Sequence, residues 1–282
     1  MEPLVSLIVA TVGRCEELER FLSAVARQSY RHFEVIIVDQ NPDDRLDSIV
    51  ARYRDGMTVV HVRCLKGVSK ARTMGLRHSR GEIIAFPDDD CWYSLSLLTS
   101  IVSGFEDHPV WDGMTGRIVN ETGALSGDAR FDSDPGYLTL ANVWRRACAA
   151  TLFLKQETVA AIGYFDEELG PGAGTPWGGA EDIDYPARAI KAGRKIYYDP
   201  EIRVFHPDLS VDAQADGLRR AYTYGAGIGR VWMKQRFPIR IIGYYLLRPL
   251  VGVGVSLVTG RWMQARYRWA AFQGRLAGLV SS

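Results

Sequence analysis

Residues 81–92 read GEIIAFPDDDCW, a short apolar run that ends in three consecutive aspartates. The run Glu82–Phe86 follows a glycine and is rich in isoleucine, which predicts a buried strand. Asp88, Asp89 and Asp90 then stand where this strand ends. Adjacent carboxylates repel one another and lose hydration when they are buried, so their position predicts a nearby cation. An acidic turn in water is the alternative, which the motif alone leaves open.

The chain before this motif alternates between predicted strands and predicted helices. Thr11 and Arg14 follow the first strand, and Asp39 follows the second. Such alternation indicates an α/β fold with a Rossmann-like, mostly parallel sheet flanked by helices. Ligands bind such sheets beyond the carboxyl ends of the strands, so these side chains and the aspartates predict a site at that edge. The strands are expected at Leu4–Val9, Phe33–Val38 and Thr58–Val62, and the helices at Glu16–Gln28, Asp47–Tyr53 and Val68–His78.

The second half of the chain has a looser pattern. Residues 170–179 read GPGAGTPWGG, and a long Gly/Pro loop inside a compact domain is usually functional or disordered. We expect helices at Ser94–Phe105, Gln156–Ile162 and Glu181–Lys191, strands at Trp111–Val119, Ala147–Leu154 and around Ile196 and Val204, and a loop over residues 120–137.

Two further features carry candidate chemistry. Glu181, Asp182 and Asp184 stand at a predicted helix start. Acids there complement the helix dipole, or the flexible loop before them delivers a carboxylate to a site. His206, in the segment VFHP, follows a predicted strand, where a lone histidine is either structural or a metal ligand beside the acidic cluster.

The net charge of +1 over 282 residues hides an uneven distribution. Residues 217–282 contain 11 Lys and Arg and no Asp or Glu, which leaves a net charge of −10 on residues 1–216. An acidic body with a basic tail suggests that the tail meets an anionic partner.

The cysteines and the N-terminus predict where the protein works. Cys15, Cys64, Cys91 and Cys148 show no CxxC spacing, so neither a zinc site nor a disulfide framework is indicated. Unpaired thiols fit a reducing compartment. The start of the chain lacks the pattern of a signal peptide. We therefore expect a cytoplasmic protein, peripheral at the inner face of the cell membrane.

The C-terminal tail is both basic and apolar. Arg261, Arg268 and Arg275 recur every seven residues beside an apolar stripe, a basic amphipathic pattern typical of membrane surfaces. Residues 241–259 are apolar enough to suggest a membrane span, but Arg248 and Pro249 interrupt them, and an arginine at mid-bilayer costs about 2.5–3.5 kcal/mol. Interfacial or re-entrant helices are therefore preferred. Packing on the catalytic domain or a homo-oligomer contact is the alternative.

Six segments occur in an order that resembles glycosyltransferase family 2, which has the GT-A fold. The resemblance covers about residues 4–207. It implies a GT-A catalytic domain over residues 1–212, with the nucleotide-binding half at about 1–92 and the acceptor half at about 93–212, followed by a helical region over 213–282. The segments are VSLIVATVGR, FEVIIVDQN, GVSKARTMGLRHSRGEIIAFPDDD, GYFDEELGPG, GGAEDIDYPARAIKAGRKIYYDP and VFHP.

The resemblance implies a nucleotide site built from several loops. The loop after the first strand, with Thr11, Val12 and Arg14, would hold the base and ribose. Asp39 would read the base edge, although the usual Asp-Asp-Gly-Ser text is Asp-Gln-Asn-Pro here, so the loop is expected to differ in shape. Arg72 would lie near the nucleotide. The resemblance favours a UDP-sugar donor, with GDP and dTDP sugars as alternatives.

The resemblance also assigns the reaction chemistry. The DxD motif maps to Asp88 and Asp90, with Asp88 near the ribose or the metal, Asp89 beside the nucleotide sugar and Asp90 coordinating Mn²⁺ or Mg²⁺. His206 matches a histidine that is a metal ligand in some members.

Asp182 would be the base that takes the proton of an acceptor hydroxyl as it attacks, which inverts the anomeric centre. Glu181 and Trp177 are expected at the acceptor, although Trp177 could equally anchor its loop in the core. A lipid-linked glycan acceptor is expected if the tail meets the membrane.

Other function classes fit the sequence less well. A nucleotide-sugar pyrophosphorylase would need more glycines than the single Gly13 in the first loop, and a dehydrogenase would need GxGxxG there. An inert sugar-nucleotide-binding scaffold would not need Asp88, Asp90, Asp182 and His206 together. No nucleic-acid recognition motif accompanies the basic tail.

Overall fold

The computed structural model describes residues 2–126, 130–208 and 215–281. The expected domain boundary between residues 212 and 213 lies outside the described residues. The described strands form one sheet in the order β3-β2-β1-β4-β8-β6-β9-β5, with β7 paired to β9. The strands are β1 Val5–Thr11, β2 Phe33–Asp39, β3 Thr58–Arg63, β4 Ile83–Ala85, β5 Trp92–Tyr93, β6 Gly113–Val119, β7 Gly136–Tyr137, β8 Phe153–Lys155 and β9 Ile196–Phe205.

The sheet is parallel in its first half and mixed in its second. Strands β1 to β4 pair in parallel, as the alternation of strands and helices predicted. Strand β8 then pairs antiparallel to both β4 and β6, and β5 and β7 pair antiparallel to β9. The expectation of a mostly parallel sheet holds, because β6 and β9 pair in parallel and point the same way as β1 to β4, whereas β5, β7 and β8 run in the opposite direction.

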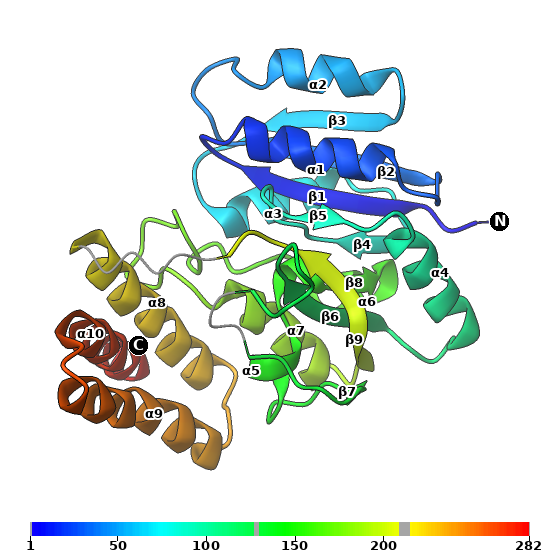
Figure 1. The fold of residues 1–282 in the computed structure, drawn as a ribbon. Helices are drawn as coiled ribbons and strands as arrows, with labels where there is room; N and C mark the ends of the chain where they lie inside the picture. Colours follow the sequence, from blue (N-terminus) through cyan, green and yellow to red (C-terminus); the bar gives the residue numbers. More distant parts are fainter. Residues whose placement is uncertain (1, 127–129, 209–214, 282) are drawn as a thin grey trace.

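Helices cover both faces of the sheet (Figure 1). One core cluster joins alternate residues of β1, such as Leu7, to α1, α2 and α4, whereas Ile8 joins the other cluster with α3, α6 and α7. This alternation follows from the two-residue period of a strand, which sends neighbouring side chains to opposite faces. These helices are α1 Glu16–Ala26, α2 Asp47–Arg54, α3 Val68–His78, α4 Leu97–Asp107, α5 Val143–Arg146, α6 Gln156–Ile162 and α7 Glu181–Lys191.

Two predictions for the second half were wrong. The apolar run Ala147–Leu154 is mostly a 3₁₀ turn at Ala149–Thr151 that leads into β8, because a short buried run has no periodicity that separates a turn from a strand. The two strands expected around Ile196 and Val204 are the single strand β9, which continues through Pro200. The two-residue strands β5 and β7 were not predicted.

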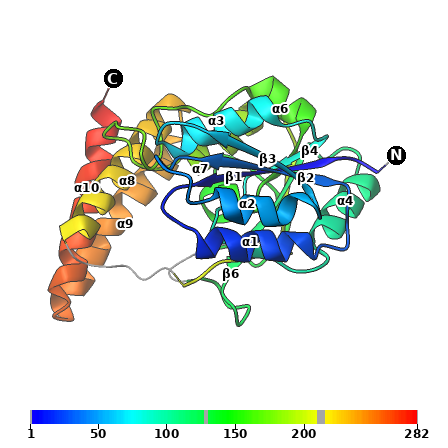
Figure 2. The same cartoon turned by 90° about the horizontal axis from the view of Figure 1, so that it is seen from above.

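The C-terminal residues form three helices, α8 Ala215–Lys234, α9 Ile239–Val258 and α10 Trp262–Val280. They stand beyond the end of the sheet toward which β1 runs (Figures 1 and 2). Trp232 and Phe237 belong to the core cluster that also contains α7 residues, so α8 is packed against the domain built around the sheet. Helix α9 is the one helix among the described residues that is long and apolar enough to cross a membrane, by length and composition alone.

Helices α8 and α10 are in backbone contact through glycines. A Cβ on Gly225 would lie 2.4 Å from the carbonyl oxygen of Ala271, and one on Gly278 would lie 2.0 Å from that of Ala226. Such close approach requires small residues at the interface, as in the glycine motifs of packed membrane helices.

Two of the three arginines spaced seven residues apart, Arg268 and Arg275 on α10, point toward α9. Pro249 has no N–H to bond the carbonyl of Tyr245, four residues earlier, and Arg275 donates to that oxygen instead. Arg268 donates to the Gly252 carbonyl at 2.6 Å. The heptad stripe was expected to face an anionic surface. Arg268 and Arg275 instead satisfy carbonyls of α9, and the proline inside that helix explains the need for Arg275.

Candidate active site

The ends of β1, β2 and β4 bring the first group of predicted residues to one edge of the sheet. Thr11 is in register with Asp39 on β2, and Ala10 forms a bridge to Asp88 beyond the end of β4. Strand β1 lies between the other two, so Asp39 and Asp88 stand about 10 Å apart across the edge, two strand spacings. Thr11 is buried, whereas Val12 is exposed on the loop that follows.

Arg14 pairs with two members of the aspartate triplet. Its Nη1 lies 2.7 Å from Oδ1 of Asp89 and 2.5 Å from Oδ2 of Asp90. Arg20 also donates to the backbone carbonyl of Asp90 at 2.9 Å. Burial raises the pKa of Asp89 to about 6 even though the charge of Arg14 opposes the shift. The triplet is therefore a buried acidic cluster, and the alternative of an acidic turn in water is excluded for Asp89 and Asp90.

Asp90 faces His206 across the sheet. Strand β5 follows Asp90 and pairs antiparallel with β9, with Trp92 opposite Phe205. This pairing brings Nε2 of His206 to 3.1 Å from Oδ1 of Asp90. Burial alone would raise the pKa of Asp90, but the contact with His206 and the charge of Arg14 outweigh it and lower the pKa. Burial would lower the pKa of His206, and the contact with Asp90 raises it instead.

The Asp90–His206 pair fits a divalent cation. Oδ1 of Asp90 is buried without a well-formed hydrogen bond, and Nδ1 of His206 lies 2.6 Å from the carbonyl oxygen of Pro207. A proton on Nδ1 leaves Nε2 with a lone pair 3.1 Å from a carboxylate oxygen, a close contact of two electron-rich atoms that a cation bound to both would relieve. Cys91 lies in the same group, but burial raises the pKa of its thiol well above the ordinary value, so it is a poor ligand.

Arg72 connects the aspartate triplet to the start of α7. Its Nη2 lies 3.0 Å from Oδ1 of Asp88, and its Nη1 lies 3.2 Å from Oε1 of Glu181. The guanidinium is fully buried and also stacks over the ring of Phe165 at 5.5 Å. Desolvation of a charge is costly, so the two carboxylates hold Arg72 in place and it in turn holds them together.

The acids at the start of α7 titrate unusually. Burial and the adjacent charge of Asp182 raise the pKa of Glu181 to about 7, against the opposing charge of Arg72. Burial raises the pKa of Asp182 as well; Arg72 opposes this shift and the charge of Asp88 adds to it. Carboxylates whose pKa values are raised by burial at a site are candidates for a general base. Asp88, Arg72, Glu181 and Asp182 therefore share one site.

The loop before α7 is held by helix α8. Ala180 adopts a left-handed conformation with a φ of 69°, which is uncommon for a residue other than glycine. The N–H of Gly178 donates to the carbonyl of Thr223 at 3.0 Å, and Gly179 lies against Tyr224. These α8 residues were not predicted to lie near the site. Three glycines at alternate positions, Gly225, Gly227 and Gly229, were the signal in the sequence of close backbone packing.

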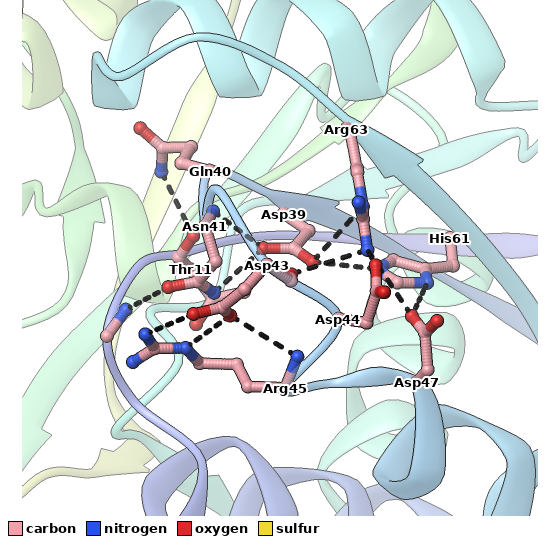
Figure 3. A network of polar contacts seen from close by, with 11 residues as sticks. Thr11, Asp39, Gln40, Asn41, Asp43, Asp44, Arg45, Asp47, His61 and Arg63 are labelled. Carbon is pink, nitrogen blue, oxygen red and sulfur yellow. Dashed lines mark hydrogen bonds and ion pairs between the residues drawn. The ribbon is translucent and has the colours of Figure 1, made fainter.

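Asp39 is wholly inside the protein (Figure 3). Its Oδ1 accepts from the backbone and side-chain amides of Asn41, both at 2.8 Å, and its Oδ2 lies 3.1 Å from Nε2 of His61. Asn41 also accepts from the N–H of Gly13 at 2.7 Å. The side chain of Gln40 accepts a hydrogen bond from the N–H of Gly67 at 2.8 Å. The unusual Asp-Gln-Asn sequence therefore connects this loop to the loops that contain Gly13 and Gly67. A base contact by Asp39 stays a prediction.

Trp177 lies apart from the charged cluster. It packs against the core, and the guanidinium of Arg230 on α8 stacks over its ring at 4.4 Å. These contacts favour the alternative that it anchors its loop. Its role toward an acceptor stays a prediction.

A comparison of the sequence with known families now identifies the class of protein. The family described as "Glycosyl transferase family 2" matches residues 6–148, and the chain belongs to it. The protein is therefore a glycosyltransferase, and the expected GT-A fold is confirmed by its structural neighbours.

Two relatives cover most of the chain. Glycosyltransferase AglE of Haloferax volcanii is 27% identical over 89% of this chain and 81% of its own length. An Escherichia coli protein, "UDP-Glc:alpha-D-GlcNAc-diphosphoundecaprenol beta-1,3-glucosyltransferase WfaP", is 23% identical over 88% of this chain and 94% of its own.

Solved structures share the fold at low identity. The mannosyltransferase PcManGT from Pyrobaculum calidifontis, in complex with GDP-Man and Mn²⁺, has a TM-score of 0.64 at 18% identity and covers 98% of this chain and 88% of that one. TarS from S. aureus, in complex with UDP-GlcNAc, has a TM-score of 0.60 at 17% identity and covers 96% of this chain and 90% of that one.

Proposed function

We propose that this glycosyltransferase is inverting and metal-dependent and transfers a sugar from a UDP-sugar to a hydroxyl of a lipid-linked glycan in polysaccharide or glycolipid synthesis. The observation that carries the proposal is the bridge made by Arg72, which joins Asp88 at the donor edge to Glu181 beside Asp182. Displacement at an anomeric carbon requires the sugar donor and a base to be held close together. The guanidinium of Arg72 contacts both the sheet edge proposed for the donor and the acids at the start of α7.

Asp182 acts as the base in this proposal. It is half-buried, and its raised pKa makes it a better proton acceptor than an ordinary aspartate once it is ionised. It takes the proton from the acceptor hydroxyl as the oxygen attacks the anomeric carbon. The nucleoside diphosphate leaves from the opposite face, so the configuration inverts. Arg72 holds the neighbouring Glu181 in place, and its charge offsets the repulsion between the two acids.

Asp90 and His206 are the residues that would hold a divalent cation, and Asp88 lies beside them at the end of β4. Mg²⁺ is bound by one or two carboxylates together with substrate phosphates, so a site with few protein ligands suits a cation shared with a diphosphate. Bound there, Mn²⁺ or Mg²⁺ would neutralise the charge that develops on the leaving group. PcManGT holds Mn²⁺ with GDP-Man, which supports this assignment.

The proposed identities of the donor and the acceptor are supported by the names of similar proteins. The name of the E. coli relative specifies UDP-Glc and a diphosphoundecaprenol-linked sugar, and TarS was solved with UDP-GlcNAc. These names favour a UDP-sugar and a lipid-diphosphate acceptor here. A GDP-sugar is the alternative, since PcManGT was solved with GDP-Man.

The exposed face of α9 supports contact with a membrane. Exposed apolar residues recur there every three or four positions, and Arg240, Arg261 and Arg266 are exposed around them. An apolar stripe with basic neighbours suits the surface of an anionic leaflet, so the enzyme is proposed to lie peripherally on the cytoplasmic face. The stripe consists of Tyr244, Leu247, Val251, Val255 and Val258.

Substitution of the base tests the proposal. Asp182→Asn keeps the shape of the side chain but removes its basicity, so we expect transfer to be lost while donor binding survives. Donor binding is read from the thermal shift with a panel of nucleotides and nucleotide sugars, with and without Mn²⁺. Full transfer activity in Asp182→Asn would remove Asp182 from the mechanism, and donor turnover by the wild type in the panel separates the enzyme from an inert scaffold.

A further inference from the structure

A polar cavity lies between α9 and the segment that contains α5. It has a volume of about 360 Å³ and is lined by Arg130, Trp144, Arg145, Tyr244, Tyr245 and Arg248. None of these residues belongs to the donor site described above. Three guanidinium groups and two phenols in one cavity offer many hydrogen-bond donors and strong positive charge, a donor set suited to phosphate.

The positive charge at this cavity is poorly compensated. Asp132 pairs with Arg145 at 2.6 Å and with Arg146 at 2.7 Å. Neither Arg130 nor Arg248 forms an ion pair with a carboxylate among residues 2–126, 130–208 and 215–281. Trp144 also leaves its buried indole N–H without an acceptor in that part of the chain. Arg130, Arg145 and Arg248 are exposed to solvent, so their free N–H groups can form charge-assisted hydrogen bonds with an anion that enters the cavity.

Arg275 lies next to a residue that lines the cavity and adds to the positive charge there. Arg275 donates to the carbonyl of Tyr245, and its buried Nε has no partner among the described groups. Burial lowers the pKa of Arg275 to about 10, and the charge of Arg248 adds to this shift. Arg248 and Arg275 therefore repel each other, and an anion between the domain and α9 would relieve that repulsion.

The cavity adjoins the apolar stripe of α9. Arg248 lies four residues after Tyr244 and three before Val251, so it lies on the same helical face as both. Tyr244 lines the cavity and is 62% exposed, and Val251 is 68% exposed. A ligand with an anionic head in the cavity could therefore lay an apolar chain along α9, which is the chemistry of a phosphorylated lipid.

The cavity is joined to the helix of the proposed base. Trp144 and Arg145 lie on α5, and α5 packs against α7, which begins with Glu181 and Asp182. Val143 of α5 and Ile183 of α7 belong to the same core cluster. A ligand in the cavity would therefore lie on the same side of the sheet as α7, which a general membrane contact would not require.

We propose that this cavity binds the diphosphate of the lipid-linked acceptor, with Arg130, Arg145 and Arg248 as its ligands and the lipid chain along the apolar stripe of α9. The inference rests on the proposed function, because it assigns a site to the acceptor of that reaction. Anionic phospholipid shares the phosphate chemistry, and the test distinguishes the two.

Calorimetric titration of the full chain with farnesyl diphosphate, without donor or metal, tests the cavity directly. Arg248→Gln is the test variant and Arg240→Gln is its control, since Arg240 is an exposed arginine of the same helix that does not line the cavity. We expect Arg248→Gln to weaken binding about tenfold and Arg240→Gln to leave it unchanged, because only the first loses a charged hydrogen bond to phosphate. Arg248→Lys, which keeps the charge, should retain part of the affinity.

The results separate the sources of phosphate and the two proposals. Three results would overturn the acceptor site. The first is an equal loss of affinity in Arg248→Gln and Arg240→Gln, and the second is no binding of farnesyl diphosphate by the wild type. The third is displacement of farnesyl diphosphate by phosphatidylglycerol vesicles as readily as by inorganic pyrophosphate. Nucleotide release from the donor in the absence of acceptor is read in parallel. It should be the same in wild type and Arg248→Gln, and its absence from every donor tested would count against the proposed function rather than against the cavity.

Discussion

The backbone of Gly227 in α8 lies directly against Gly179, two residues before α7 begins. A Cβ on Gly227 would come within 2.1 Å of the carbonyl oxygen of Gly179. No side chain fits there, so α8 forms a wall of the loop that leads to the proposed base. Helix α8 thereby supports the loop that leads to the proposed base, in addition to its packing against α10.

Gly227→Ala should impair catalysis by moving that loop. The added methyl must push Gly179 or α8 aside, and a displacement of about 1 Å at a reacting group costs about 100-fold in rate. Steady-state transfer kinetics would show the loss in kcat, with donor binding retained. Gly243→Ala is the control, because nothing lies within 4 Å of a Cβ built there on α9. Equal activity of the two variants would contradict the role of α8.

The pH profile should report the acids at the start of α7. Burial raises the pKa values of both acids, and the charge of Asp182 adds to the shift of Glu181, so we expect the acidic limb of kcat/KM well above the pKa of an ordinary aspartate. Transfer rises with pH through this limb because the base must lose its proton. Glu181→Gln removes the repulsion, so Asp182 ionises more easily and the limb moves to lower pH. An unchanged limb would show that another group controls it.

Metal affinity should depend on the protonation of His206. A proton on Nε2 competes with the cation, so we expect Mn²⁺ to bind more tightly as pH rises through the raised pKa of His206. His206→Gln should weaken Mn²⁺ binding about tenfold or more and remove this pH dependence, since even outer-shell partners of metal ligands contribute that much. Calorimetry with Mn²⁺ measures both. Activity that persists undiminished in EDTA would end the metal assignment.

The same proton affects the stability of the metal-free protein. The pKa of His206 is higher in the folded chain than in the unfolded chain. Its contribution to the free energy of unfolding is therefore full below the ordinary histidine pKa and is lost as pH rises through the folded value. Urea unfolding across this range, compared with His206→Gln, should show the loss in wild type alone.

The apolar stripe of α9 should govern binding to lipid. Val251 is 68% exposed on that stripe, and Val251→Glu replaces an apolar side chain with a charge. Burial of a valine contributes about 1.5 kcal/mol, so we expect at least about tenfold less sedimentation with phosphatidylglycerol vesicles. Val110→Glu, at a residue 60% exposed before β6, is the matched control and should sediment like the wild type. Equal partitioning of both variants would place the membrane contact elsewhere.

Much of the donor edge could be predicted because parallel buried strands have continuous apolar runs. Asp39 and Asp88 follow such runs, so their place at one edge of the sheet was readable from the sequence. The family resemblance placed Arg72 near the nucleotide, but its bridge between Asp88 and Glu181 was not predicted. His206 was predicted either as a metal ligand beside the acidic cluster or as a structural residue, and its contact with Asp90 joins two elements that no local pattern connects.

The rest depends on contacts that a linear pattern does not encode. The Arg14 side chain is long enough to reach either a nucleotide or Asp89, and only the fold shows that it reaches the aspartates. The turn at Ala149–Thr151 and the strand β8 are both short and buried, and so have no distinguishing period. Arg275 was taken for a surface charge because its partner, the carbonyl left free by Pro249, is visible only when two helices pack together.

The pairing of β5 with β9 has a consequence for biosynthesis. The ribosome delivers Asp90 early and His206 late, and only the Trp92–Phe205 register brings them together. A nascent chain, or a product truncated before β9, carries the aspartates without the imidazole. Under the proposed role, acquisition of the cation is thereby coupled to completion of the domain.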